Sequence, residues 1–197
     1  MSLTFVSGWA GYPELYPGLA KRAEFLLPFV GMDERTIVRQ LQRGGDTLMA
    51  WSTGAHMVLK YWRAIEPHFG RIVLAAPFLD FTSFTPERVV RLMLRQFGKD
   101  PGAVLHQFLK NCGCPRTVAC DPAHAEPLAQ GLRYLLESRA HPAHSGGHKV
   151  VLVHGQHDRI VAPEASEDIL QHLHGARFLA LPCGHWIPEN ELFVLLD

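Results

Sequence analysis

Residues 48–56 read LMAWSTGAH, a run in which one serine separates an apolar, strand-like segment from a helix-like segment. Ala50 and Gly54 stand two residues before and two residues after Ser52. Small residues at these two places permit a sharp turn that raises a serine hydroxyl above the end of a sheet, although glycine is usual at both. Serine is also a favoured N-cap of helices, so the local pattern leaves two interpretations of Ser52, a nucleophile or a cap.

Short apolar runs flanked by turn residues recur along the chain. Six of them predict strands, at residues 3–8, 24–31, 46–52, 71–77, 148–155 and 176–182. Several are continuously apolar, which is typical of strands that are buried on both faces of a parallel sheet. Apolar residues at helical spacing predict helices between the strands, at residues 33–44, 53–65 and 163–175. This alternation indicates an α/β fold with a doubly wound, mostly parallel six-stranded sheet.

A long segment without strand signals separates the fourth and fifth predicted strands. It carries three helix patterns, at residues 85–98, 100–113 and 125–140, which begin near prolines. An all-helical insertion in the middle of an α/β sheet is most simply a cap or lid. We therefore expect an α/β core formed by residues 1–77 and 148–197 and a helical lid formed by residues 78–147.

The bulk composition argues against several classes of partner. The 197 residues are 47% hydrophobic and 19% charged, as in an ordinary globular domain, and 19 basic residues balance 19 acidic ones. This balance argues against nucleic acid or an anionic membrane as a partner. The first residues lack the features of a signal peptide, and no apolar run approaches the length of a transmembrane helix. We expect a cytoplasmic protein.

Three of the four cysteines, Cys112, Cys114 and Cys120, lie in the stretch NCGCPRTVAC, close to His124. Their C-x-C-x5-C spacing matches no strong zinc motif, and no second pair of ligands follows. We therefore expect no metal site and interpret these side chains as reduced thiols. Histidines also gather in HPAHSGGH, at residues 141–148, where Pro and Gly predict a loop that serves as a linker.

A serine nucleophile needs a base, and the base needs an orienting acid. Asp158 follows the fifth predicted strand, in GQHDRIVAP, and His185 follows the sixth, in CGHWIP. The order serine, acid, histidine along the chain is that of the α/β-hydrolases. Because residues that follow the carboxyl ends of parallel strands converge on one edge of the sheet, we expect Ser52, Asp158 and His185 to form a catalytic triad.

Acyl transfer at a serine also needs hydrogen-bond donors for the oxyanion. The backbone N–H of Thr53, directly after Ser52, is one candidate. The loop after the first predicted strand, SGWAG, offers the second, because Gly8 permits a tight turn and the N–H of Trp9 follows it. We expect Trp9 and Thr53 to form the oxyanion hole, and this chemistry requires no cofactor.

The motifs SGWAG, AWSTGA, GQHDRIVAP and CGHWIP resemble those of the α/β-hydrolase superfamily over nearly the whole chain. The sequence looks most like the small esterases that cleave pimeloyl-[acyl-carrier-protein] methyl ester in biotin synthesis, whose Gly-Trp oxyanion turn and Trp-Ser elbow match Gly8-Trp9 and Trp51-Ser52. The resemblance implies a serine carboxylesterase that acts on a small-molecule or carrier-linked acyl ester. Ala50 departs from the family's glycine, and we expect a minimal sheet without the two leading antiparallel strands of larger members.

Arg88, Arg91 and Arg95 recur at three-to-four spacing and share one face of a predicted lid helix. Acyl carrier proteins are acidic, so such a stripe would steer one toward the site, whereas a solvated helix face is the alternative interpretation. We take these arginines and Trp51 as candidate substrate-binding residues and an acyl carrier protein as a candidate partner.

The same triad serves thioesterases and general short-chain esterases, and the sequence does not separate them from a methyl esterase. A misaligned triad would leave a non-catalytic binding protein of the same fold. A haloperoxidase-like or lyase variant stays open as well, since fold does not imply function.

Overall fold

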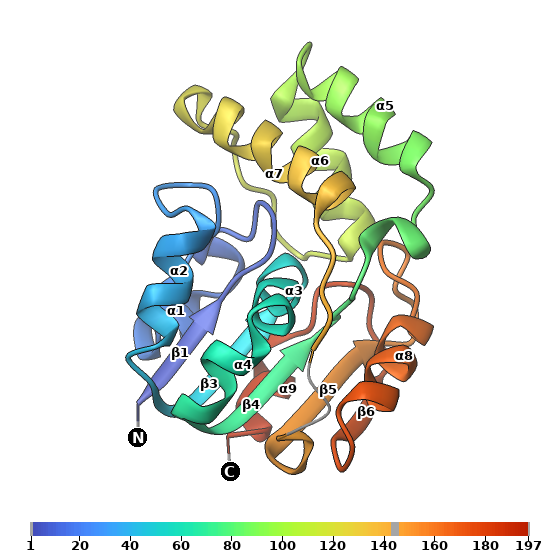
Figure 1. The fold of residues 1–197 in the computed structure, drawn as a ribbon. Helices are drawn as coiled ribbons and strands as arrows, with labels where there is room; N and C mark the ends of the chain where they lie inside the picture. Colours follow the sequence, from blue (N-terminus) through green and yellow to red (C-terminus); the bar gives the residue numbers. More distant parts are fainter. Residues whose placement is uncertain (1, 143–145, 197) are drawn as a thin grey trace.

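Within residues 2–142 and 146–196, which the computed structural model describes, six strands form one sheet in the order β2-β1-β3-β4-β5-β6 (Figure 1). Every neighbouring pair of strands is parallel. The strands are β1 (Leu3–Val6), β2 (Glu24–Leu26), β3 (Gly45–Trp51), β4 (Phe69–Ala75), β5 (Val150–Gly155) and β6 (Arg177–Leu181). The predicted α/β fold with a parallel six-stranded sheet is confirmed.

Helices cover both faces of this sheet, because successive strand residues point to opposite sides and both sets are apolar. One buried cluster contains Phe5, Met49 and Val73 and includes residues of α1 (Pro17–Arg22) and α9 (Glu189–Val194). A second cluster contains the neighbouring strand residues Val6, Leu48 and Ile72. It includes residues of four helices, α2 (Glu34–Leu41), α3 (Thr53–Lys60), α4 (Trp62–Ile65) and α8 (Glu164–His172).

The segment between β4 and β5, residues 78–147 and hereafter the insertion, carries the helices α5 (Glu87–Phe97), α6 (Pro101–Cys112) and α7 (Ala125–Glu137). They lie together beyond the carboxyl ends of the strands (Figure 1). The α6 helix begins where predicted, since the Asp100 side chain accepts the N–H of Ala103 at 2.9 Å. It ends at Gly113, whose φ of 79° suits glycine. Buried residues of all three helices join the first cluster.

Some predicted boundaries were wrong for local reasons. The strand expected at 24–31 ends at Leu26, because Pro28 has no N–H to donate and Phe29 has a φ of 71°. The helix expected at 53–65 is interrupted at Tyr61, which separates α3 from α4. The helices α1 and α9, each of six residues, were not predicted because they span less than two helical turns.

Five short 3₁₀ helices connect these elements within the described residues. They are η1 (Pro13–Leu15), η2 (Glu66–His68), η3 (Phe81–Ser83), η4 (Pro122–His124) and η5 (Gly147–Lys149). Residues 143–145 of the predicted HPAHSGGH loop lie outside the described residues. None of the described helices has the length and apolar character needed to cross a bilayer.

The start of α3 packs directly on the end of β1. A Cβ atom added at Gly54 would lie 2.5 Å from the carbonyl oxygens of both Val6 and Ser7. Backbone atoms cannot give way as a flexible side chain can, so only glycine permits this approach. Gly54 thereby fixes the position of the β3–α3 turn relative to β1.

We expect Gly54→Ala to lower the free energy of unfolding by about 1–3 kcal/mol, as overpacking in a well-packed interior does. Gly98→Ala is the matched control, because a Cβ there would meet no atom closer than 3.7 Å and its φ of −65° suits alanine. That control should change stability by less than about 1 kcal/mol. Urea unfolding measures both, and a Gly54→Ala protein as stable as the wild type would contradict the close packing.

Candidate active site

Ser52 occupies the turn between β3 and α3 with a φ of 54° and a ψ of −118°. A positive φ is uncommon for a residue with a side chain and marks a constrained turn. The Ser52 N–H donates to the Ala75 carbonyl at 2.8 Å, and the Ser52 carbonyl accepts the His56 N–H at 2.9 Å. The hydroxyl makes no cap hydrogen bond to α3. The helix-cap interpretation of Ser52 is therefore wrong.

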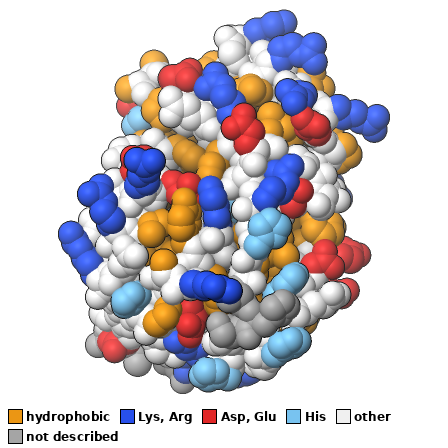
Figure 2. Space-filling view, viewed as in Figure 1, with side chains coloured by type: hydrophobic (Ala, Val, Ile, Leu, Met, Phe, Trp, Pro, Cys, Tyr) orange, Lys and Arg blue, Asp and Glu red, His pale blue; other side chains and the backbone are white. Residues whose placement is uncertain are grey.

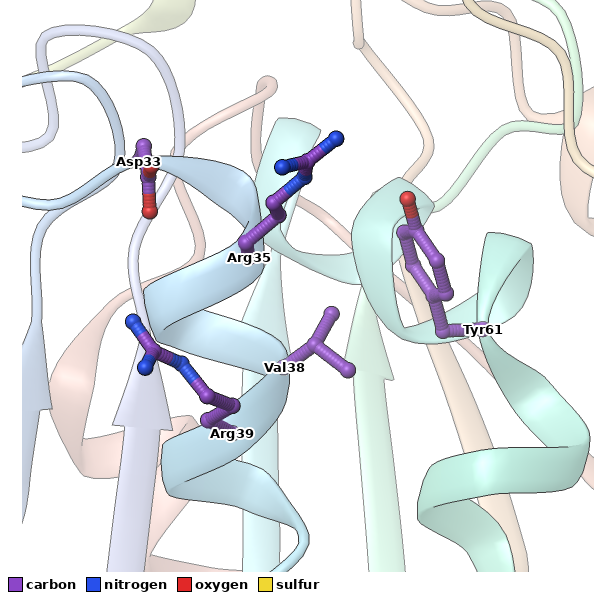
Figure 3. Close-up of a pocket in the computed structure, with 5 residues that line it drawn as sticks. All are labelled: Asp33, Arg35, Val38, Arg39 and Tyr61. Carbon is purple, nitrogen blue, oxygen red and sulfur yellow. The ribbon is translucent and has the colours of Figure 1, made fainter.

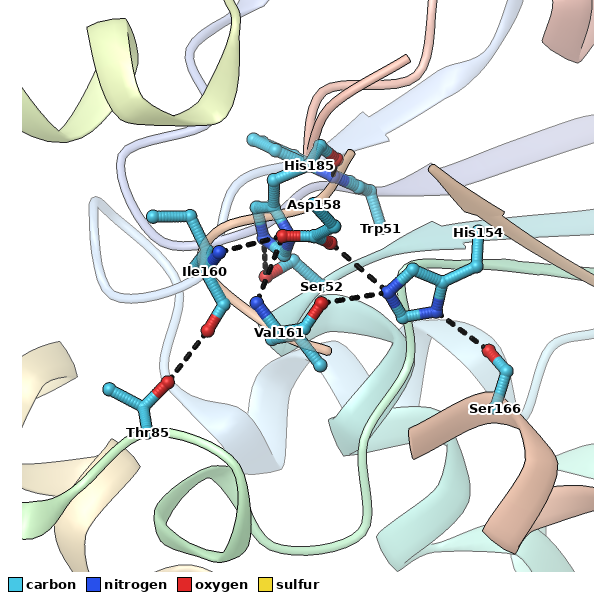
Figure 4. Close-up of polar contacts among 9 residues, drawn as sticks. All are labelled: Trp51, Ser52, Thr85, His154, Asp158, Ile160, Val161, Ser166 and His185. Atoms are coloured by element: carbon cyan, nitrogen blue, oxygen red, sulfur yellow. Dashed lines mark hydrogen bonds and ion pairs between the residues drawn. The ribbon is translucent and has the colours of Figure 1, made fainter. Parts of the chain in front are cut away.

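The hydroxyl of Ser52 instead faces a histidine (Figure 4). Its Oγ lies 2.8 Å from Nε2 of His185, and Nδ1 of the same ring lies 2.7 Å from Oδ2 of Asp158. Because an ionised carboxylate only accepts hydrogen bonds, Nδ1 donates to Asp158, and Nε2 is left to accept the Ser52 hydroxyl. The three residues expected to meet at the sheet edge do so, in a continuous hydrogen-bonded line.

The line is buried in the protein. Ser52 is 5% exposed, and the side chains of His185 and Asp158 are fully buried. Burial by itself raises the pKa of Asp158. The adjacent His185 imidazole and the hydrogen bonds from His154, His185 and the Val161 N–H outweigh burial and hold the pKa of Asp158 well below its usual value. The acid is therefore ionised at neutral pH.

His154 is a neighbour of Asp158 that the sequence analysis did not single out. It lies on β5, four residues before Asp158, and its Nε2 is 3.1 Å from Asp158 Oδ2. Its Nδ1 lies 2.8 Å from the hydroxyl of Ser166 on α8. The residue type indicates a special role for His154, because it is the one ionisable side chain in the otherwise apolar strand VVLVHG.

The loop expected to supply an oxyanion donor lies against Ser52. A Cβ added at Gly8 would be 3.0 Å from the Cβ of Ser52, so the turn that carries the Trp9 N–H packs against Ser52. The Gly11 N–H donates to the Gly8 carbonyl at 3.0 Å and closes this turn. Thr53 is the first residue of α3, where a backbone N–H has no acceptor within the helix.

The two tryptophans of the motifs are both buried and hydrogen-bonded. Trp9 donates from Nε1 to the Leu128 carbonyl in the insertion at 2.8 Å, and Phe108 of α6 packs edge-on against it at 4.8 Å. Trp51 donates from Nε1 to the carbonyl of His185 at 2.8 Å and so supports the histidine loop. The substrate-binding role expected for Trp51 stays a prediction.

The arginines Arg88, Arg91 and Arg95 are exposed on α5, and Arg91 forms an ion pair with Glu87 one turn earlier. Basic side chains gather on the part of the surface formed by the insertion, with acidic and apolar side chains between them (Figure 2). The structure thus places the predicted stripe on the surface and outside the buried triad. Its role in binding substrate remains a prediction.

A surface hollow of about 570 Å³ lies elsewhere, between α2 and the end of α3 (Figure 3). It is lined by Asp33, Arg35, Val38, Arg39 and Tyr61. None of these residues belongs to the triad or contacts it through a hydrogen bond described above. The hollow therefore does not supply the reacting groups.

The cysteines are all free. Cys112 supports the histidine loop through its backbone, since its carbonyl accepts the N–H of Trp186 at 2.9 Å. Burial is the main cause that raises the pKa of Cys183 to about 11, and it also raises the pKa of the Cys112 thiol. Thiols with a raised pKa are protonated at neutral pH and are weak nucleophiles.

Comparison with protein families decides the class of this site. The family model described as serine hydrolase (FSH1) matches residues 34–195, which include Ser52, Asp158 and His185. The chain belongs to the serine hydrolase (FSH1) family. Membership of this family makes the protein an enzyme. None of the curated proteins compared with it matches.

Solved structures share the fold of this serine hydrolase. An esterase (EaEST) from Exiguobacterium antarcticum is 16% identical, with a TM-score of 0.70, over 100% of this chain and 90% of its own. The 2-hydroxy-6-oxo-6-phenylhexa-2,4-dienoate hydrolase (BphD) from Rhodococcus sp. strain RHA1 is 17% identical, with a TM-score of 0.71, over 99% and 88%. A thermophilic esterase from Thermogutta terrifontis is 14% identical, with a TM-score of 0.61, over 99% and 86%.

The insertion is hydrogen-bonded to the α/β core through His56, a fully buried residue of α3. Its Nδ1 lies 3.1 Å from the Phe78 carbonyl, where the chain enters the insertion, and its Nε2 lies 2.8 Å from the Ser138 hydroxyl, where the chain leaves it. Tyr134 of α7 adds a hydrogen bond to Glu34 of α2. Burial is the largest effect on His56 and lowers its pKa to about 4.

The low pKa of His56 predicts a pH-dependent stability. The unfolded chain takes up a proton at this histidine below pH ~6.5, whereas the folded protein does so only below about 4. The contribution is therefore complete above pH ~6.5 and is lost as the pH falls toward 4, by up to about 3 kcal/mol. Urea unfolding across this range should show a steeper loss for wild type than for His56→Asn, and equal slopes would contradict the assignment.

Proposed function

We propose that this serine hydrolase cleaves carboxylic esters by two-step acyl transfer at Ser52. The observation that carries the proposal is the buried line of hydrogen bonds from Ser52 Oγ to His185 Nε2, at 2.8 Å, and from His185 Nδ1 to Asp158 Oδ2, at 2.7 Å. A nucleophile, a base and an orienting acid in this order are what acyl transfer requires. A non-catalytic binding protein would have no need of this alignment or of the constrained turn at Ser52.

In the first step His185 takes the proton of Ser52 as Oγ attacks the ester carbonyl. Asp158 keeps the imidazole in the tautomer that can accept this proton and stabilises the imidazolium that forms. The N–H groups of Trp9 and Thr53 stabilise the oxyanion, and loss of one such donor typically costs about 100- to 1,000-fold in rate. His185 then protonates the departing alcohol, and water releases the acyl group from Ser52.

We further propose that the insertion is a lid. Ser52 is only 5% exposed and α5, α6 and α7 lie beyond the strand ends, so an ester must displace part of the insertion to reach the hydroxyl. The indole of Trp9 packs among insertion residues while its backbone carries a proposed oxyanion donor. Movement of the lid is therefore expected to disturb the oxyanion turn, and closure to restore it.

As the substrate we propose an acyl ester carried on an acyl carrier protein, with pimeloyl-[acyl-carrier-protein] methyl ester as the specific candidate. The similarity of the motifs around Trp9 and Ser52 to the pimeloyl methyl esterases supports it, and so does the exposure of Arg88, Arg91 and Arg95 on α5. A thioesterase and a general short-chain esterase are the outcomes that a substrate series would distinguish from it.

Hydrolysis of p-nitrophenyl esters of increasing acyl length tests the reaction. Ser52→Ala should lower kcat/KM by at least about a thousandfold, because the nucleophile is lost. The exposed Ser83 provides the control, and Ser83→Ala should retain wild-type activity. A fluorophosphonate probe should label wild type and not Ser52→Ala. A wild-type protein that is neither labelled nor active on any ester would refute the proposed function.

Reversal of charge on α5 tests the carrier. The double variant Arg91→Glu/Arg95→Glu should lower kcat/KM for pimeloyl-[acyl-carrier-protein] methyl ester roughly tenfold, because basic surface charges speed the encounter with an acidic partner. Activity on p-nitrophenyl acetate should be unchanged. Arg43→Glu, at an exposed site beyond the end of α2, is the matched control. Equal losses on both substrates would argue against docking at α5.

A further inference from the structure

His154 is a fully buried imidazole in the middle layer of the protein, on a strand whose other side chains are apolar. A buried polar ring destabilises the fold unless hydrogen bonds replace its lost water. Both ring nitrogens have partners. Nε2 lies 3.1 Å from Asp158 Oδ2 and 3.0 Å from the Val161 carbonyl, and Nδ1 lies 2.8 Å from Ser166 Oγ (Figure 4).

These partners determine which nitrogen carries the proton. The carboxylate of Asp158 and the carbonyl of Val161 only accept hydrogen bonds, so Nε2 of His154 is the donor to both. Nδ1 is then the acceptor, and the hydroxyl of Ser166 donates to it. Asp158 and Val161 thus fix the tautomer of His154, and Ser166, itself fully buried on α8, helps to hold the orientation of the ring.

The two oxygens of Asp158 are held in different ways. Oδ1 accepts the backbone N–H groups of Ile160 and Val161, at 2.7 and 2.9 Å. Oδ2 accepts His185 Nδ1 at 2.7 Å and His154 Nε2 at 3.1 Å. Among the described residues, Oδ2 therefore has one donor besides His185, the histidine that it orients, and that donor is His154.

From this arrangement we propose that His154 is a positioning residue for the reaction and that Ser166 supports it. Together with the two backbone N–H groups on Oδ1, His154 fixes the rotation of the Asp158 carboxylate, and through it the His185 ring, without touching the substrate. The proposal rests on the proposed triad and extends it by one residue that lies on β5. In the sequence Val-His-Gly-Gln-His-Asp, His154 lies near the end of β5 and Asp158 lies in the loop that follows this strand.

The consequence is a loss of rate with little loss of binding. Without a donor from His154, Oδ2 keeps only the hydrogen bond from His185, and only the two backbone N–H groups on Oδ1 then oppose a rotation of the carboxylate together with the imidazole. A misplacement of about 1 Å in a catalytic group can cost about 100-fold in rate. Substrate contacts are unchanged, so the effect falls on kcat, while KM should change by less than about twofold.

Three variants test the proposal with p-nitrophenyl acetate as the substrate. His154→Leu removes the donor and should lower kcat by about 10- to 100-fold. In His154→Gln the side-chain amide N–H can replace Nε2–H, and this variant should recover most of the lost rate. Ser166→Ala leaves the ring without its orienting hydroxyl and should lower kcat by about three- to tenfold, again with KM unchanged.

Proton NMR supplies a readout that a purely structural role would not change. The proton shared by His185 Nδ1 and Asp158 should give a downfield resonance in wild type and His154→Gln, and that resonance should be shifted or lost in His154→Leu. If folded His154→Leu and Ser166→Ala both keep wild-type kcat, the positioning role is overturned. If His154→Leu does not fold, Ser166→Ala decides the question: a wild-type kcat in that variant overturns the positioning role, and a lowered kcat with unchanged KM supports it.

Failure of the triad itself would look different. In that case Ser52→Ala would still be active or would still be labelled by the fluorophosphonate probe, whatever the behaviour of the His154 variants. If Ser52→Ala is inactive and unlabelled while His154→Leu is folded and fully active, the triad stands and the role of His154 is rejected. Loss of kcat in His154→Leu with rescue by His154→Gln supports both.

Discussion

At Ser52 the chain passes from β3 into α3 through a backbone conformation, φ 54°, that a residue with a side chain adopts only under constraint. The constraint comes from two neighbouring strands. The end of β4 accepts the Ser52 N–H through Ala75, and the end of β1 receives Gly54 at a distance that excludes a Cβ. Contacts with the strands on both sides of β3 therefore hold the Ser52 hydroxyl above the edge of the sheet. The other residues of the site are arranged around this hydroxyl.

Starting at Ser52, a chain of hydrogen-bonded polar groups runs into the apolar interior of the protein. Buried polar groups stabilise a fold only when all of them find partners, and here each atom has one. Ser52 bonds to His185, His185 to Asp158, Asp158 to His154, and His154 to Ser166. This chain crosses from β3 through the loops after β6 and β5 to α8. Burial opposes the negative charge of Asp158 in the middle of this chain, and the adjacent His185 and the hydrogen bonds that the carboxylate accepts outweigh burial and keep this acid ionised.

The insertion completes the enclosure and is tied to the core by side chains close to the site. His56, one helical turn after Ser52, bonds to both connections of the insertion, and Trp9 inserts its indole among α5, α6 and α7. Ser52, the turn proposed to bind the oxyanion and the insertion are thus linked by a small set of contacts. The proposed opening of the insertion as a lid would break some of these contacts, and substrate access would then be coupled to the geometry around Ser52.

Hydrophobic periodicity and turn residues in the sequence were enough to determine the six parallel strands, the helical insertion and the serine, acid and histidine at strand ends. These are local signals, and parallel topology brings strand ends together without further information. Only the tertiary structure decided that the Ser52 hydroxyl faces His185 instead of capping α3, that Trp51 supports the His185 loop, and that His154 contacts the acid. Such contacts join side chains from different elements, Ser52 and His185 being 133 residues apart. Their partners depend on how helices and strands pack, which no spacing along the chain encodes.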